Sequence, residues 1–175
     1  MSVILGIDPG SRLCGYGLIN ARGSKLEDLA SGVIKMGTSP FSERLHTIFT
    51  DISDIINEFA PSEAAIEEVF MGKNASSALK LGQARGAAIV ACTRFDLPVA
   101  EYSARRVKQA LVGKGQAEKS QVQQMVKSIL GLSRVPAEDA ADALAIAICH
   151  ANTENSLIRM AGVKSGRRGR LQASD

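Results

Sequence analysis

The sequence has no tryptophan, only two histidines and only three cysteines, which are Cys14, Cys92 and Cys149. Because the number of cysteines is odd and no two of them are close in the chain, we expect neither a disulfide framework nor a cysteine-rich zinc site. His46 and His150 are too few for a histidine-based metal centre. Any metal site must therefore consist mainly of oxygen ligands, which favour Mg²⁺ or Mn²⁺ over zinc.

Long hydrophobic runs are also absent. No apolar segment approaches the roughly 20 residues that a membrane-spanning helix needs, and no signal-peptide pattern precedes the first apolar run. Hydrophobic residues make up 45% of the 175 residues and charged residues 22%, which is typical of a globular protein with a full core. These features predict a single-domain cytoplasmic protein without a membrane partner.

The net charge is only +3, but it is unevenly distributed. Residues 104–134 contain seven basic residues and one acid, and residues 155–175 contain five basic residues and one acid, so the rest of the chain is net acidic. A basic segment on an acidic body favours a polyanionic partner such as nucleic acid, although a solvated helix face is the simpler alternative. The polar segment 155–175 is expected to be a disordered tail behind a folded domain at residues 1–154.

Apolar periodicity and turn residues predict the secondary structure. Ser39 is expected to cap one helix and Asn74 another. The expected strands cover residues 3–7, 15–19, 32–36, 64–70 and 98–102. The expected helices cover residues 40–60, 74–95, 104–112, 117–130 and 136–152. The second of these helices has a face of small residues, which suits a buried core helix or a dimer seam. Antiparallel strands followed by strand–helix crossovers predict an α/β fold, with a mixed five-stranded sheet and helices on both faces.

Two of the expected strands end on acids. Asp8 follows the first apolar run directly, and a carboxylate at the end of a buried strand costs free energy unless a cation or hydrogen-bond donors compensate its charge. The alternative is that Asp8 only opens the turn at Pro9-Gly10. Glu67 and Glu68 stand in the strand at 64–70, and neighbouring strand residues point to opposite faces. At most one of these two glutamates can therefore join Asp8.

A further pair of acids opens the last expected helix. Asp139 and Asp142 are three residues apart and share a helix face, although acids in a first helical turn can simply complement the helix dipole. The apolar run that follows should pack on the sheet and hold both acids near the strand ends, where sites in open α/β sheets gather. Four such carboxylates require cations, and two Mg²⁺ ions about 3.5–4 Å apart form a phosphoryl-transfer site. Mn²⁺ is an expected substitute.

Four motifs carry a resemblance to a known family, and they are Gly6–Ser11, Ala65–Phe70, Lys73–Gly86 and Asp139–Ala145. In this order they are specific, and the sequence resembles the RuvC family of Holliday-junction resolvases over residues 1–153. The resemblance implies a ribonuclease H-like fold and a symmetric homodimer that makes paired nicks across a four-way DNA junction in recombination and repair. It also implies Mg²⁺ dependence, a preference for certain T-containing sites, and work alongside the RuvA–RuvB branch-migration complex.

The resemblance also implies roles for individual residues. The catalytic, metal-binding acids are Asp8, Glu67, Asp139 and Asp142. Phe70 matches an aromatic residue that stacks on junction bases, and Lys108 and Lys119 match lysines at the DNA surface. The family has a glutamine-like residue where this chain has Glu68, which leaves the contribution of that second acid open. The alternative function is that of a non-catalytic or differently targeted ribonuclease H-like nucleic-acid-binding relative, which would need the basic surface but not the acids.

Overall fold

The computed structural model describes residues 1–69, 74–160 and 162. Its five strands form one sheet in the order β3-β2-β1-β4-β5, with β1 in the centre. The antiparallel part is β1 with β2 and β2 with β3, and the parallel part is β1 with β4 and β4 with β5. The strands are β1 (Ser2–Asp8), β2 (Leu13–Arg22), β3 (Lys25–Lys35), β4 (Glu63–Glu67) and β5 (Val99–Tyr102). The predicted mixed five-stranded sheet is confirmed.

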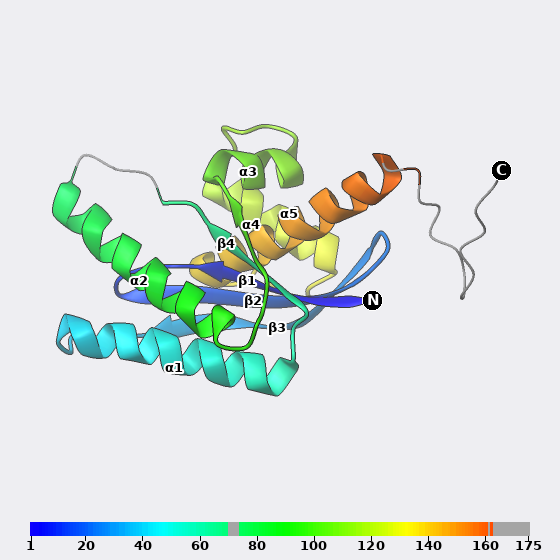
Figure 1. The fold of residues 1–175 in the computed structure, drawn as a ribbon. Coiled ribbons are helices and arrows are strands. Elements are labelled where there is room, and N and C mark those ends of the chain that lie inside the picture. Colours follow the sequence, from blue (N-terminus) through cyan, green and yellow to red (C-terminus); the bar gives the residue numbers. More distant parts are fainter. Residues whose placement is uncertain (70–73, 161, 163–175) are drawn as a thin grey trace.

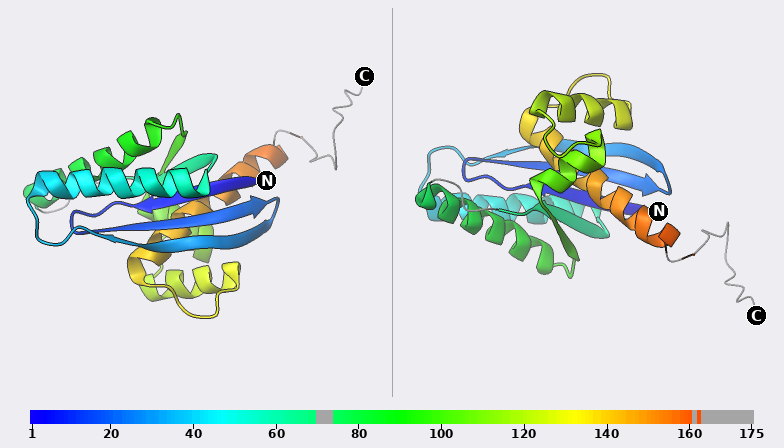
Figure 2. Two further views of the ribbon diagram at one scale, coloured as in Figure 1. Left: turned by 90° about the horizontal axis from the view of Figure 1, so that it is seen from below. Right: turned by 90° about the horizontal axis from the view of Figure 1, so that it is seen from above.

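Helices cover both faces of this sheet, as predicted (Figures 1 and 2). One face is covered by α1 and α2, and α5 crosses the other face with α3 and α4 packed beside it. The helices are α1 (Phe41–Phe59), α2 (Ala75–Thr93), α3 (Ala104–Val112), α4 (Lys119–Leu130) and α5 (Glu138–Met160). None of the helices in the part of the chain that the structure describes is long and apolar enough to cross a membrane.

Glycines let α5 lie directly against the sheet. A Cβ atom added to Gly6 of β1 would lie 2.0 Å from the Ala143 carbonyl oxygen, and one added to Gly15 of β2 would lie 2.0 Å from the Asp139 carbonyl oxygen. Any side chain at these two positions would force the helix away, because the interior is closely packed. The absence of side chains thus places the first turns of α5 beside the C-terminal end of β1.

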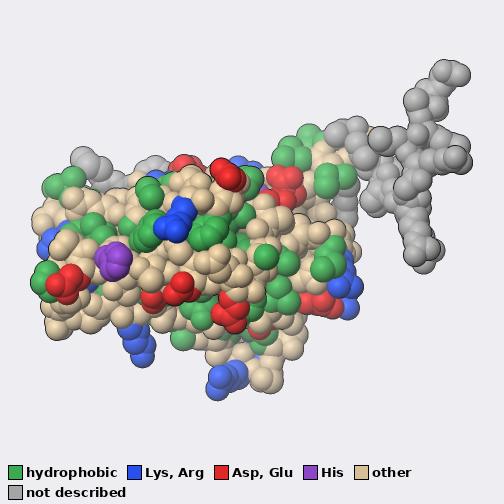
Figure 3. Space-filling view, turned by 60° about the horizontal axis from the view of Figure 1, so that its bottom comes forward, with side chains coloured by type: hydrophobic (Ala, Val, Ile, Leu, Met, Phe, Trp, Pro, Cys, Tyr) green, Lys and Arg blue, Asp and Glu red, His purple; other side chains and the backbone are tan. Residues whose placement is uncertain are grey.

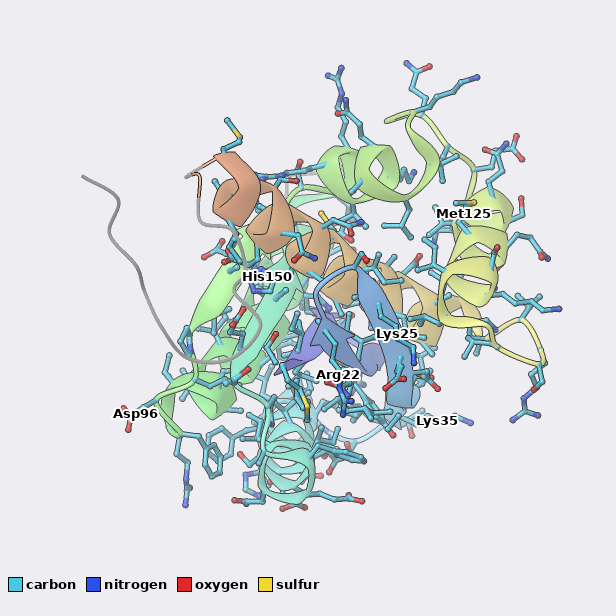
Figure 4. The ribbon with its side chains drawn as sticks, turned by 90° about the vertical axis from the view of Figure 1, so that its right-hand side faces the viewer. Arg22, Lys25, Lys35, Asp96, Met125 and His150 are labelled. Carbon is cyan, nitrogen blue, oxygen red and sulfur yellow. The ribbon has the colours of Figure 1, made fainter. Side chains whose placement is uncertain are left out.

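A polar network holds the distal half of α5 to the sheet. The Tyr102 hydroxyl of β5 shares a hydrogen bond of 2.8 Å with His150 Nδ1, and His150 Nε2 shares one of 2.6 Å with a carboxylate oxygen of Glu63 in β4. Figure 4 shows His150 on the sheet-facing side of α5. The imidazole is 5% exposed, so both of its nitrogens need partners. The network satisfies them and fixes the direction in which α5 crosses the strands.

Two predicted element boundaries are wrong at their N-terminal ends. Ser39 does not cap α1, because its hydroxyl donates to the Met36 carbonyl oxygen at 3.2 Å and Pro40 occupies the capping position without a side-chain bond. The third strand begins at Lys25 rather than at residue 32, since its polar first half pairs along β2 in a long hairpin. The Asn74 cap is confirmed, because its side-chain oxygen accepts from the Ser77 N–H at 3.2 Å.

Three boundaries are wrong at their C-terminal ends, and the first is that of the second strand, which ends at Arg22 rather than at residue 19. The fourth strand ends at Glu67 rather than at residue 70. The last helix continues to Met160 rather than ending at residue 152, and Asn155 donates from its side chain to the Gly23 carbonyl oxygen at 2.8 Å. Local polarity concealed this extension, because the final turns run past the edge of the sheet with mostly exposed side chains. Of the tail expected after residue 154, residues 161 and 163–175 lie outside the described residues.

Candidate active site

The parallel pairing of β1 with β4 brings two of the predicted acids together. Ile7 pairs with Ile66, so Asp8 and Glu67 end neighbouring strands at the same edge of the sheet. Two residues earlier, Gly6 and Ala65 both face α5. Because side chains alternate along a strand, Asp8 and Glu67 also point to the α5 side.

The opening turn of α5 adds the other two acids. The pKa of the Asp8 carboxyl is raised from 3.8 to about 8, first by burial and then by the negative charges of Glu67, Asp142 and Asp139. Burial also raises the pKa of Glu67 and of Asp142, and Asp142 adds to the effect on Glu67. The structure therefore brings all four predicted acids within electrostatic reach of one another, with Asp8 as the most deeply buried member.

Lys119 is a basic residue that forms an ion pair with this cluster. Its ammonium group at the start of α4 pairs with Glu138, and it lies 3.7 Å from a carboxylate oxygen of Asp142. Its charge lowers the pKa values of Asp8, Glu67 and Asp142 against the larger effect of burial. The Lys119 side chain is 62% exposed, so the same amine can also reach a ligand outside the cluster.

The remaining predicted residues fall into three groups. Lys108 on α3 is half-buried, and its charge lowers the pKa of Glu67, so it lies on the same side of the site. Glu68 follows Glu67 directly, and its backbone N–H donates to the Tyr102 carbonyl oxygen at 2.9 Å. Phe70 lies outside the described residues. The structure thus places Lys108 and Lys119 around the four acids.

The donor set suits a divalent cation in its chemistry. All four side chains offer carboxylate oxygens, the ligands preferred by Mg²⁺ and Mn²⁺. Within the described residues no group of three or more histidine, cysteine, aspartate or glutamate side chains is drawn together closely enough to coordinate an ion. The negative charges of Glu67, Asp142 and Asp139 raise the pKa of Asp8, so a cation would stabilise the ionised form of the cluster. The acids therefore fit a metal by ligand type and by charge.

Sequence reasoning missed Arg85 and Glu101. Arg85 on α2 donates from Nε to the backbone carbonyl oxygen of Glu67 at 3.0 Å, and its guanidinium also pairs with the Glu101 carboxylate of β5. The available signal was an arginine among the small residues of a helix packed on the sheet. A charged side chain in such a place is seldom buried without a partner.

A wide groove in the described part of the chain lies away from the four acids. A groove of about 1000 Å³ is bordered by Met1, Arg22, Glu63, Glu154 and Ile158, among others, and none of the four acids lines it. The carboxylates instead stand at an open edge of the sheet, near the basic helices α3 and α4. The face drawn in Figure 3 carries acidic, basic and hydrophobic side chains that are scattered among one another. An open acidic site beside a basic surface suits an extended polyanion better than a small enclosed ligand.

Sequence comparison finds close relatives over nearly the whole chain. The model of the family "Crossover junction endodeoxyribonuclease RuvC" matches residues 4–150. The RuvC protein of Teredinibacter turnerae is 61% identical, covering 97% of this chain and 99% of the relative. The RuvC protein of Marinobacter nauticus is 60% identical, covering 95% of this chain and 98% of the relative.

Solved structures with a similar fold come from the same family and from another resolvase. The chain resembles T. thermophilus RuvC in complex with a Holliday junction substrate, with a TM-score of 0.84 and 38% sequence identity over 89% of this chain and 96% of that chain. The yeast mitochondrial Holliday junction resolvase Ydc2 shares the fold at a TM-score of 0.64 and 13% identity, over 91% of this chain and 84% of that chain. The predicted ribonuclease H-like fold class is thereby confirmed.

Proposed function

Because the chain belongs to the RuvC family of crossover junction endodeoxyribonucleases, we propose that it resolves four-way DNA junctions at the edge of the sheet where Asp8, Glu67, Asp139 and Asp142 meet. The observation that carries this assignment is geometric: the neighbouring ends of β1 and β4 and the first turns of α5 bring four carboxylates together at one edge of the sheet, where burial and three neighbouring carboxylates raise the pKa of Asp8. Buried acids held close together lower the stability of the fold, and such clusters are typical of functional sites. In a non-catalytic relative, no function of the acids would offset this loss of stability.

The four acids are proposed to hold two Mg²⁺ ions, or Mn²⁺ in their place. Bound at such a site, these ions activate water and stabilise the charge on the attacking and leaving oxygens of a phosphodiester. The role of the protein's own side chains is to orient the metal ligands and to balance their charge. Asp8 and Glu67 are fixed by adjacent strands, whereas Asp139 and Asp142 are fixed by a helix whose backbone lies directly against Gly6 and Gly15 of the sheet.

The basic helices are proposed to hold the DNA backbone. Lys108 and Lys119 stand beside the acids, close enough to change their pKa values, so each could contact phosphates next to the scissile bond. Phe70 is still predicted to stack on unpaired bases, which an open junction centre offers and a linear duplex does not. The related T. thermophilus protein was captured with a Holliday junction, which supports the same substrate class for this chain.

A homodimer is proposed because two symmetric nicks need two sites. The small residues of α2 divide into two faces, and Ala84 and Ala88 are fully buried in the core. An outward stripe contains Leu79, Gly82 and Val90, with side chains 70% and 56% exposed at Leu79 and Val90 and open space over the glycine. This stripe is the candidate dimer seam. The RuvA–RuvB complex as partner and the cytoplasm as location are proposed from the family alone.

Cleavage of a synthetic mobile four-way junction tests this function. With Mg²⁺ we expect paired nicks at symmetry-related positions, no nicks in EDTA, and little cutting of a linear duplex of the same sequence. Asp8→Asn should bind the junction at least as well as the parent protein, because a negative charge near phosphates is removed, and should not cut it. Near-parental cleavage by Asp8→Asn, or equal cutting of the duplex, would contradict the proposal.

A further inference from the structure

The main chain at Glu67 lies where β4 ends. Glu67 is the last residue of β4, and the parallel ladder with β5 ends where Glu67 pairs with Tyr102. The next N–H group, that of Glu68, still donates to the Tyr102 carbonyl oxygen. The carbonyl oxygen of Glu67 accepts a hydrogen bond from a side chain, because the Nε–H of Arg85 donates to it at 3.0 Å.

The other end of the Arg85 guanidinium is held as well. Its terminal nitrogen pairs with the carboxylate of Glu101 in β5, and the Arg85 side chain is only 19% exposed. One side chain of α2 therefore joins the ends of β4 and β5. A guanidinium can do this because its donors diverge in a fixed plane, whereas a lysine ammonium is a single point of charge.

We propose that Arg85 is a positioning residue for Glu67, and that Glu101 serves it by orienting the guanidinium. The inference rests on the proposed function, since it takes Glu67 as a metal ligand. The Glu68 N–H belongs to the peptide group that follows Glu67, and it donates to the Tyr102 carbonyl oxygen of β5, so the sheet restrains this peptide group from its N–H side only. The hydrogen bond from Arg85 supplies the second restraint, and a fixed carbonyl fixes the direction in which the carboxylate of the same residue leaves the chain.

The consequence concerns metal binding more than substrate binding. Arg85 makes both of its contacts within the protein, on the backbone of one residue and on a carboxylate of another. Groups that orient metal ligands typically change metal affinity or activity by about 10–100-fold when they are replaced. Loss of the restraint should therefore lower metal affinity and the cleavage step together, and leave junction affinity unchanged.

The test compares Arg85→Gln, Arg85→Lys and Glu101→Gln with Lys80→Gln, which removes one exposed charge from the same helix. The first readout is Mn²⁺ affinity by titration calorimetry, without DNA. The second is the single-turnover cleavage rate at saturating junction, and the third is junction affinity in EDTA. We expect Arg85→Gln to lose about tenfold or more in Mn²⁺ affinity and cleavage rate. Its junction affinity should be unchanged. Glu101→Gln and Arg85→Lys should have intermediate Mn²⁺ affinities and cleavage rates, and Lys80→Gln should behave like the parent protein.

A Glu67→Gln background separates positioning from general damage. If Arg85 acts through Glu67, adding Arg85→Gln to Glu67→Gln should lower Mn²⁺ affinity no further, because coupled residues are not additive. Parental Mn²⁺ affinity and cleavage in Arg85→Gln, with Glu67→Gln inactive, would overturn the positioning role alone. If Glu67→Gln cleaves like the parent, the proposed function of Glu67 fails and this inference fails with it. Should Arg85→Gln not fold, Glu101→Gln and Arg85→Lys carry the same comparison.

Discussion

Asp8 is the residue whose carboxyl is affected by the charges of the other three acids of the site. It ends the central strand, is enclosed by α5, and faces three other carboxylates. Burial disfavours its ionised form and the neighbouring charges add to that effect. Without a cation the folded protein therefore carries a cost at Asp8 that an unfolded chain does not carry.

This cost predicts a pH-dependent effect of Asp8→Asn in EDTA. Between pH 4 and 8 the folded state binds a proton at Asp8 that the unfolded state has released, since the pKa rises from 3.8 to about 8 on folding. The contribution of Asp8 to stability accordingly falls as the pH rises through this window and stays at its lowest value above it. Urea unfolding should show Asp8→Asn to be more stable than the parent at pH 8.5, with a smaller difference at pH 5. Adding Mg²⁺ should also reduce the difference, and a gain independent of pH would contradict this account.

Lys119 illustrates a single amine with two available partners. It pairs with Glu138 and lies near Asp142, yet most of its side chain is exposed. We expect Lys119→Met to weaken junction binding for all sequences and to make the dependence of log K on log salt shallower by about one unit. Filter-binding or anisotropy titrations over a range of salt concentrations measure this slope. Lys25→Met serves as control, because Lys25 pairs with Glu27 in the distant β2–β3 hairpin (Figure 4). An unchanged salt slope in Lys119→Met would mean that Lys119 acts only as a counter-ion of the carboxylates.

At the scale of elements, the close approach of α5 to the sheet shapes the site. Three glycines of β1 and β2 face the helix, and they are Gly6, Gly15 and Gly17. The helix brings Asp139 and Asp142 to the sheet edge because no side chain at Gly6 or Gly15 separates its first turns from the strands. The His150 network anchors the same helix further along, so the direction of α5 is determined at both ends.

Gly15→Ala tests this close approach. Its new Cβ would lie 2.0 Å from the Asp139 carbonyl oxygen, so the first turns of α5 must shift outward. We expect a loss of about 1–3 kcal/mol in the free energy of unfolding, the usual cost of overpacking, and slower cleavage by the folded fraction. Leu13→Ala in the same strand is the control, because Leu13 is 43% exposed. Unchanged stability and cleavage in Gly15→Ala would show that α5 can move without affecting the acids.

At the scale of the whole molecule, the two sides of the sheet have different tasks. The α5 side carries the acids and the basic helices, whereas the α2 side carries the outward stripe around Leu79 and Val90. A second copy bound to this stripe would leave both sets of acids accessible to DNA. The arrangement suits an enzyme that must cut two strands of one junction.

Leu79→Asp tests the proposed seam. Because Leu79 is 70% exposed, an aspartate there should cost the monomer little, while a charge in a dimer seam is expected to disrupt association. Sedimentation or light scattering should show a shift from dimer to monomer, and junction cleavage should change from paired to single, uncoordinated nicks. A Lys80→Gln variant, which changes the net charge by the same one unit, controls for charge, and an unchanged dimer in Leu79→Asp would place the seam elsewhere.

Local patterns in the sequence were sufficient for much of the fold. Apolar alternation predicted five strands, and three- and four-residue spacing predicted five helices, because both periods follow from backbone geometry alone. The acids at the strand ends and the Asn74 cap could be recognised in the same way. The errors were at boundaries, at Ser39, at the first half of β3 and at the end of α5, where polar residues are ordered by contacts with distant parts of the chain.

The sequence by itself determined which residue types the site contains and that Asp8 and Glu67 belong to strands. Only the tertiary structure decided that β1 and β4 are parallel neighbours in register, which places these two acids side by side. It also decided that Lys119 pairs with Glu138 and that Arg85 reaches the backbone of Glu67. The physical reason is the range of the interactions involved. Helix and strand propensities act within a few residues, whereas strand register and the partners of charged side chains depend on how segments far apart in the chain pack.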